Sequence, residues 1–220
     1  MILEVKQLTK EYQRCGNTFE AVHGVSFSIQ KGKFIAIMGH SGCGKSTLFH
    51  MITGLTKPDS GTVFLDGEEV TAMNQAELAK LRNTSVGYIL QGQNLLSNFT
   101  VIENICMPAF LGKCGSDTFS YAQELIKKFG LEKMKNVMPS ELSGGERRRV
   151  AIARALIQRP KFIIADEPTS NLDEENSEII LSYLRQISLE GTTVLISSHA
   201  SGVAAYVDEV WKMKKGIILF

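Results

Sequence analysis

The chain has 220 residues, of which 44% are hydrophobic, and its formal net charge is +1. These values suit one globular unit with an ample core, and they give no strong electrostatic bias toward nucleic acid or anionic lipid. No apolar run approaches the roughly 18 residues that a membrane-spanning helix needs, and the alternating start, residues 1–6, predicts a strand and not a signal peptide. Four scattered cysteines without metal-ligand spacing indicate reduced thiols in a cytosolic protein.

The first predicted elements form an antiparallel β region over about residues 2–30 and 61–70. Within its second stretch, Asp66-Gly67 has the composition of a two-residue hairpin turn. Between the two stretches lies the apolar run Phe34 to Met38, which predicts a strand buried on both faces, as parallel strands are.

A glycine-rich loop follows this strand and leads into a helix expected from about Lys45 to Thr53, with Gly54 in position to end it. The loop fits the phosphate-binding pattern G-x-x-x-x-G-K-[ST], and its residues are Gly39, His40, Ser41, Gly42, Cys43, Gly44, Lys45, Ser46 and Thr47. Backbone N–H groups at the helix N-terminus favour an anion. Lys45 is expected to reach the β- and γ-phosphates of a nucleotide, and the Ser46 hydroxyl to ligate Mg²⁺.

A helical insertion is expected over about residues 92–157, after a strand near 86–90. It is predicted to contain a loop around Pro108 and Gly112, and then a helix near residues 118–129.

The end of this insertion carries a second glycine-containing helix start. Ser143 and Glu146 have the spacing of a capping box, but a capping box does not need Gly144 and Gly145, each of which weakens a helix by about 1 kcal/mol relative to Ala. Two glycines expose backbone N–H groups, as an anion site requires. Because the chain has two such sites and one evident nucleotide, a second subunit is predicted to share them. The basic run 147–149 is interpreted as a solvated helix face, since nucleic-acid binding needs a broader basic surface.

Acidic residues end the next predicted strand. The apolar run Phe162 to Ala165 leads into Asp166 and Glu167, which therefore lie at the carboxyl end of a parallel strand, where open α/β sheets bind ligands. Asp166 is expected to hold Mg²⁺ through water, and Glu167 to polarise the attacking water. A further strand near residues 193–197 ends close to His199. If it lies beside the Asp166 strand, the imidazole comes near the γ-phosphate.

With these motifs the sequence resembles the ATP-binding cassette (ABC) family along its whole length, and within it the macrolide-exporter and lipoprotein-release subgroup. The matching segments are Phe34 to Leu48, Asn94 to Asn104, Leu142 to Leu156 and Ala165 to Asp173. The resemblance implies a single ATP-binding domain over residues 1–220. Its implied fold class is α/β: a P-loop NTPase (RecA-like) core with an antiparallel β subdomain and a helical signature subdomain.

The resemblance also implies roles for further residues. Tyr12 would stack on adenine, and Gln91 would sense Mg²⁺ and the permease. The signature, Ser143 to Glu146, would act in trans on the partner's nucleotide, Asp173 would act across the dimer, and His199 would be the switch histidine.

The implied activity is an ATPase that uses ATP and Mg²⁺ and works as an ATP-dependent head-to-tail homodimer. It would sit on the cytoplasmic, inner face of the cell membrane and power transmembrane permease subunits on separate chains, for export or extraction of a hydrophobic or peptide-like substrate. No nucleic-acid partner is expected. Three departures from the family pattern remove no chemical group from the ATPase: Arg148 where Gln is common, Ala200 where an acid is usual, and the stretch Trp211 to Gly216, which differs from the usual strand-turn.

The main alternative is mechanotransmission, in which the same motor drives a membrane partner without moving substrate across. Soluble ABC ATPases fit worse, because translation types carry two cassettes and repair types carry long coiled coils for which this chain has no room. A non-catalytic subunit is disfavoured because both Glu167 and His199 are present.

Overall fold

A computed structural model describes residues 1–14, 17–92, 95–112 and 115–220. Asn94 and two of the four cysteines, Cys15 and Cys114, lie outside these ranges. The strands are β1 (Leu3–Arg14), β2 (Asn17–Ile29), β3 (Phe34–Met38), β4 (Ser60–Leu65), β5 (Glu68–Glu69), β6 (Val86–Ile89), β7 (Phe162–Ala165), β8 (Thr193–Ser198), β9 (Glu209–Lys214) and β10 (Ile217–Leu219). The α-helices are α1 (Lys45–Ile52), α2 (Gln75–Thr84), α3 (Val101–Leu111), α4 (Thr118–Lys128), α5 (Gly144–Leu156) and α6 (Glu174–Leu189).

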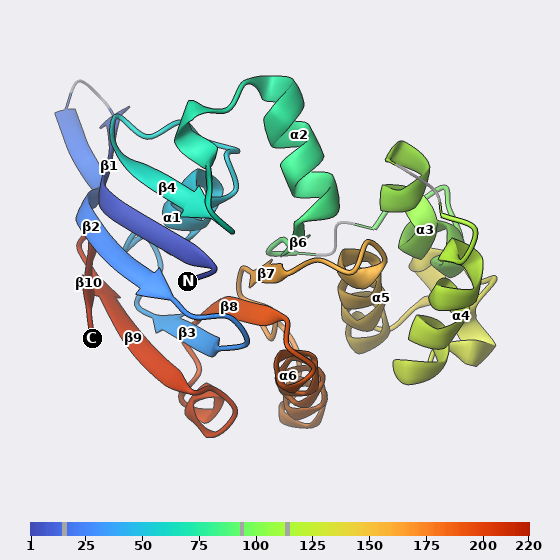
Figure 1. The fold of residues 1–220 in the computed structure, drawn as a ribbon. Helices are drawn as coiled ribbons and strands as arrows, with labels where there is room; N and C mark the ends of the chain where they lie inside the picture. The colour runs from blue at the N-terminus through green and yellow to red at the C-terminus, as the bar shows by residue number, and fades with distance from the viewer. Residues whose placement is uncertain (15–16, 93–94, 113–114) are drawn as a thin grey trace.

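Two sheets organise the structure (Figure 1). The first is antiparallel, with the strand order β2-β1-β4-β5, and the second has the order β10-β9-β3-β8-β7-β6. In the second sheet every pairing is parallel except that of β9 with β10. Helix α1 lies between the two sheets (Figure 1), and its apolar side chains pack in a core to which both sheets contribute side chains.

The central strands are buried on both faces, as their unbroken apolar sequences predict. In β3, Phe34 and Ala36 point into one hydrophobic cluster, whereas Ile35 and Ile37 point into the other. Side chains alternate along a strand, so a single apolar run supplies two cores. The sheet therefore separates an α1-side core from a core formed with the later helices.

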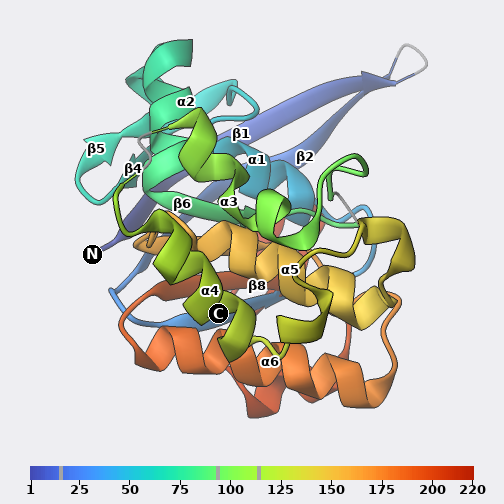
Figure 2. The same ribbon diagram turned by 90° about the vertical axis from the view of Figure 1, so that its right-hand side faces the viewer.

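Helices α3, α4, α5 and α6 cover the face opposite α1, and they lie in front of the sheet in Figure 2. The first three belong to the segment between β6 and β7, which are neighbouring strands. No helix within the described ranges is long and apolar enough to cross a bilayer.

Most element predictions are confirmed. The hairpin turn between β4 and β5 has φ of 49° at Asp66 and 88° at Gly67, both in the left-handed region that such turns use. Helix α1 ends at Ile52, and Gly54, with φ of 64°, follows it.

The predicted loop around Pro108 is wrong. Pro108 lies inside α3, which ends at Leu111 with Gly112 as its C-cap. Proline lacks an N–H group and usually disrupts a helix interior, but here the Pro108 carbonyl accepts hydrogen bonds from Asn83 Nδ2 at 2.8 Å and Gln158 Nε2 at 3.2 Å. These tertiary bonds hold the last turn of α3 in place.

Asn104 organises the segment that enters α3. Its side chain is fully buried and accepts a hydrogen bond from the Leu96 N–H at 2.8 Å. Its amide group donates to the carbonyls of Leu96, Phe99 and Thr100 at 2.8–3.1 Å. The side-chain amide of Asn104 thus forms hydrogen bonds with backbone groups of the loop that precedes α3.

We predict that Asn104→Ala lowers the free energy of unfolding by about 3 kcal/mol, because it leaves several buried backbone groups unpaired. Urea unfolding followed by circular dichroism measures this. The exposed Asn98→Ala is the matched control and should change stability by less than about 0.5 kcal/mol. Equal stability of the two variants would show that the Asn104 bonds do not hold this segment.

Candidate functional site

The glycine-rich loop ends in a helix N-terminus that is open to a ligand. Gly44 is the N-cap of α1 with φ of 112°, and no side chain among the described residues caps it. A Cβ at Gly44 would lie 2.1 Å from the Ala21 carbonyl oxygen, so only glycine fits between the loop and β2. The first N–H groups of α1 lack intrahelical acceptors, and together they suit a phosphate group.

Lys45 is buried beneath this loop with 5% of its surface exposed. Its ammonium group donates to the carbonyl oxygens of Gly39 at 2.7 Å and His40 at 3.2 Å, and it lies 3.9 Å from the sulfur of Cys43. A buried charge needs such partners. The Lys45 ammonium group is therefore already held in the loop, where it can bind an anionic ligand. The next residue, Ser46, is half-buried in the first turn of α1.

Ser197 of β8 bonds to both acidic residues predicted after β7, to the carboxylate of Asp166 and to the backbone of Glu167. The Ser197 hydroxyl donates to Asp166 Oδ1 at 2.5 Å and accepts from the Glu167 N–H at 2.8 Å. Asp166 is 4% exposed, and its own N–H donates to the Ile89 carbonyl at 2.8 Å. These bonds fix the backbone and the buried carboxylate at the end of β7.

Three other predicted site residues converge on the Glu167 carboxylate. Gln91 Nε2 donates to its Oε2 at 3.1 Å, His199 Nδ1 lies 3.6 Å from the same oxygen, and Lys45 Nζ lies 4.0 Å from Oε1. Glu167 has a φ of 47°, which is unusual for a residue with a side chain. Strain of this kind persists only where the surroundings hold it, and here the Ser197 hydroxyl does so.

The signature forms the predicted capping box at the start of α5. The Ser143 N–H donates to Glu146 Oε2 at 2.7 Å, and Ser143 Oγ accepts from the Glu146 N–H at 3.2 Å. The Ser143 backbone N–H, followed by its hydroxyl, lowers the pKa of the Glu146 carboxyl below its usual value. Gly144 begins the helix, and no hydrogen bond between described residues joins this signature to the glycine-rich loop of the same chain.

The signature instead lies against the start of α6. A Cβ at Gly145 would lie 2.3 Å from Asn176 Oδ1, so a larger residue would collide with α6. Asp173 caps α6 by accepting from the Asn176 N–H at 2.8 Å, which is the main reason that its pKa is lowered. Asp173, which is predicted to act across the dimer, and the signature thus both contact Asn176.

Tyr12 lies in β1, directly opposite Phe19 of β2. The two ring centroids are 5.9 Å apart with planes tilted by 32°, and both rings are partly exposed. Further along β2 lies Ala21, whose carbonyl touches Gly44. The aromatic pair therefore lies on the same strand that borders the glycine-rich loop.

Sequence reasoning missed Ser197 and Phe19, because a serine late in a strand and an aromatic residue in a hairpin are common. It was wrong about part of the basic run. Arg148 is not solvated: it is 6% exposed and donates to the carbonyls of Leu90 at 3.1 Å and Gly92 at 3.4 Å. Arg147 and Arg149 are half-buried.

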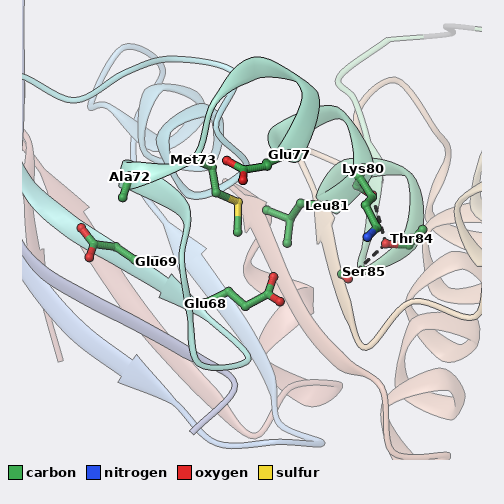
Figure 3. A pocket seen from close by; sticks show the side chains of 9 residues that line it. All are labelled: Glu68, Glu69, Ala72, Met73, Glu77, Lys80, Leu81, Thr84 and Ser85. Carbon is green, nitrogen blue, oxygen red and sulfur yellow. Dashed lines mark hydrogen bonds between the residues drawn. The ribbon is translucent and has the colours of Figure 1, made fainter.

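A separate cavity of about 530 Å³ lies between β5 and α2, away from these residues. Figure 3 shows the side chains of Met73 and Leu81 pointing into it. Two of its carboxylates already have partners within the same segment, since Glu77 caps α2 and Glu69 accepts from Thr71. It contains none of the predicted site residues.

Comparison with known proteins decides the family. The sequence profile of the ABC transporter family matches residues 22–170. The chain belongs to the ABC transporter family. This ABC ATPase is 41% identical over 219 residues to the lipoprotein-releasing system ATP-binding protein LolD of Shewanella frigidimarina, with 99% of the chain and 92% of that relative covered. It is also 41% identical to the macrolide export ATP-binding/permease protein MacB of Mannheimia succiniciproducens, of which it covers 34%.

Solved structures agree with this assignment. The ATP-binding cassette MJ0796, in a dimeric post-hydrolysis state bound to ADP and Pi, superposes with a TM-score of 0.91 at 34% identity, covering 99% of this chain and 97% of that one. A nucleotide-free cassette from an ABC transporter gives 0.83 at 28% identity, covering 100% of this chain and 90% of that one. The predicted α/β P-loop NTPase fold and the predicted ATPase activity are confirmed.

We predict that Ser197→Ala in this ABC ATPase lowers turnover by at least about tenfold while ATP affinity stays within about twofold, because the Glu167 backbone loses its anchor. Steady-state ATPase assays and nucleotide titration measure the two quantities. The control is Ser188→Ala, which removes another buried serine hydroxyl, bonded at 2.9 Å to the Gly32 carbonyl. If both variants lose turnover equally, the effect comes from stability and not from the site.

Proposed function

We propose that this ABC ATPase binds ATP with Mg²⁺ at the glycine-rich loop and that Glu167 polarises the attacking water. The observation that carries the proposal is the convergence of Gln91, His199 and Lys45 on the Glu167 carboxylate, within 3.1–4.0 Å. Phosphoryl transfer depends on positioning and charge neutralisation. A carboxylate held by a cation, an amide and an imidazole has the surroundings that this chemistry requires.

The remaining loop residues bind the phosphates in this proposal. Lys45 reaches the β- and γ-phosphates when it exchanges the loop carbonyls for phosphate oxygens, and the N–H groups of residues 39–47 surround the phosphate chain. Ser46, Asp166 and Gln91 hold Mg²⁺, with Asp166 acting through water. The oxygen atoms that they supply are the ligands this ion prefers. When bound, Mg²⁺ neutralises charge on the phosphates.

Tyr12 stacks on the adenine ring in this proposal, and Phe19 stabilises the tyrosine by packing beside it. Offset aromatic pairs contribute about 1 kcal/mol beyond their buried area. The course of β2 supports this role for Tyr12, because the strand leads from Phe19, opposite Tyr12, to Ala21, whose carbonyl lies beside Gly44 in the phosphate-binding loop.

A second copy of the chain completes each site. Ser143, Gly144, Gly145 and Glu146 act on the nucleotide of the partner subunit, and Asp173 acts across the same interface. The two glycines at the start of α5 support this arrangement, as does the absence, between described residues, of a hydrogen bond from the signature to the glycine-rich loop of its own chain. Dimeric structures of MJ0796, at 34% identity, support a homodimer.

The dimer powers a transmembrane permease, to which it binds at the cytoplasmic face of the membrane. We propose that the permease is a separate chain and that the substrate is hydrophobic or peptide-like. The alternative is mechanotransmission without movement of substrate across the membrane, and release of a cargo is supported by the relative named as a lipoprotein-releasing system ATP-binding protein. A neighbouring gene for a four-span permease with a large outer domain would support either version over uptake.

Glu167→Gln is expected to keep ATP binding and to lower turnover by about a hundredfold or more, because an amide cannot accept a proton from water. The variant should also accumulate as an ATP-bound dimer, since hydrolysis is what opens the interface. Steady-state ATPase assays and gel filtration with ATP measure both effects. Turnover close to that of the unchanged protein would remove Glu167 from the catalytic role.

A mixing experiment tests the shared site. Ser143→Arg should bind ATP as a monomer but fail to dimerise, because a bulky cation fills the space for the partner's γ-phosphate. Lys45→Ala should lose ATP binding. Mixed together, the two proteins can form one intact site per heterodimer, so weak ATP-dependent association is expected by analytical ultracentrifugation. If hydrolysis is independent of protein concentration and unaffected by Ser143→Arg, the two-subunit proposal fails.

A further inference from the structure

Arg148 lies in α5, the helix that begins with the signature, and its side chain contacts the loop that follows β6. The guanidinium Nη1 donates to the carbonyl oxygens of Leu90 at 3.1 Å and Gly92 at 3.4 Å. These carbonyls belong to the residues on either side of Gln91. One side chain therefore holds the backbone before and after the residue that contacts the Glu167 carboxylate at 3.1 Å.

Burial of the Arg148 side chain removes a charged group from water, which is energetically unfavourable. The residue is 6% exposed, and no carboxylate among the described residues forms an ion pair with it. Burial accordingly lowers the pKa of its guanidinium below the usual value, and arginine side chains keep their charge in proteins. A buried cation without an anionic partner is stabilised only by well-directed hydrogen bonds, and the carbonyls of Leu90 and Gly92 supply them.

The guanidinium suits this task because it carries several N–H donors in a rigid plane. A single Nη can serve two carbonyl oxygens while its stem packs in the core beneath. A glutamine, common at this position in the family that the chain resembles, has a shorter side chain and only two amide hydrogens. Arg148 therefore gives this chain a longer and more strongly polar link to the loop.

Two residues near the start of helix α5 are therefore connected to two different parts of the chemistry. Ser143 caps the start of α5, and Arg148 lies in its second turn. Helix α5 also packs directly against β6, the strand that leads into the loop. A shift of α5 must carry the Leu90 and Gly92 carbonyls with it or break both bonds.

We propose that Arg148 is a positioning residue that ties Gln91 to the signature helix, so that Gln91 meets Glu167 only when α5 is correctly placed. This inference rests on the proposed function, in which Ser143 contacts the partner's nucleotide. Arg148 then couples binding of the partner's nucleotide by Ser143 to the position of Gln91 against the Glu167 carboxylate of the same chain. It touches neither ATP nor Mg²⁺ itself.

The test is a double-mutant cycle between Arg148 and Gln91. Arg148→Met keeps an unbranched apolar stem of the same length as glutamine but removes every donor, and we expect it to lower kcat by about tenfold and to raise the Mg²⁺ concentration for half-maximal activity several-fold. The KM for ATP should stay within about threefold. Arg148→Gln, which retains amide donors, should recover part of the lost turnover.

The cycle separates positioning from a merely structural role. If Arg148 acts through Gln91, Arg148→Met should cost almost nothing further in a Gln91→Ala background. The control is Arg147→Met, which removes a half-buried arginine from the same helix and should leave kcat and the Mg²⁺ dependence unchanged. Urea unfolding of every variant identifies losses that arise from instability, and if Arg148→Met is unstable the cycle is run with Arg148→Gln.

Fully additive losses in the cycle, or equal losses in Arg148→Met and Arg147→Met, would overturn the inference. Glu167→Gln is measured in parallel. If it abolishes turnover while the cycle is additive, only the positioning role of Arg148 fails. If Glu167→Gln retains turnover, the proposed catalytic site fails instead.

Discussion

The parallel pairing of β3, β8, β7 and β6 is the constraint on which the site depends. Parallel strands end at one edge of a sheet, and the loops that follow them meet there. Four strands end at this edge, and the segments that follow β3, β6, β7 and β8 contain the glycine-rich loop, Gln91, Glu167 and His199, respectively. A change in strand order would scatter these residues, although every local motif would remain intact.

Two unfavourable features are maintained at this edge. Lys45 keeps a charge at 5% exposure, and Glu167 keeps a left-handed backbone with φ of 47°. Each is compensated by groups already in place: loop carbonyls hold the ammonium, and the Ser197 hydroxyl holds the Glu167 N–H. The site is therefore preorganised before a nucleotide arrives, which reduces the rearrangement that accompanies binding.

Much of the fold and the site could be predicted from sequence, because the relevant signals are local. The apolar run Phe34 to Met38 identifies a buried strand, and the loop that follows predicts a phosphate site, without any knowledge of the neighbouring elements. Ser143 and Glu146 likewise form their capping box within one helical turn.

The errors and omissions concern residues whose surroundings come from distant segments. Pro108 remains helical because side chains at 83 and 158 bind its carbonyl. Arg148 is buried because carbonyls after β6 reach it, and nothing in the run 147–149 distinguishes its middle residue from the others. Propensity and periodicity describe a residue's own element, and they contain no information about such partners.

The segment between β6 and β7 has a consequence for how the chain folds. Val86 pairs with Phe162 although residues 90–161 separate these two strands. The pairing must wait until that long stretch has closed, and such non-local contacts form late and slowly. The entropy of closure rises only with the logarithm of the intervening length. Surface loops within this stretch can therefore lengthen or shorten at little thermodynamic cost, provided that the two strands still meet.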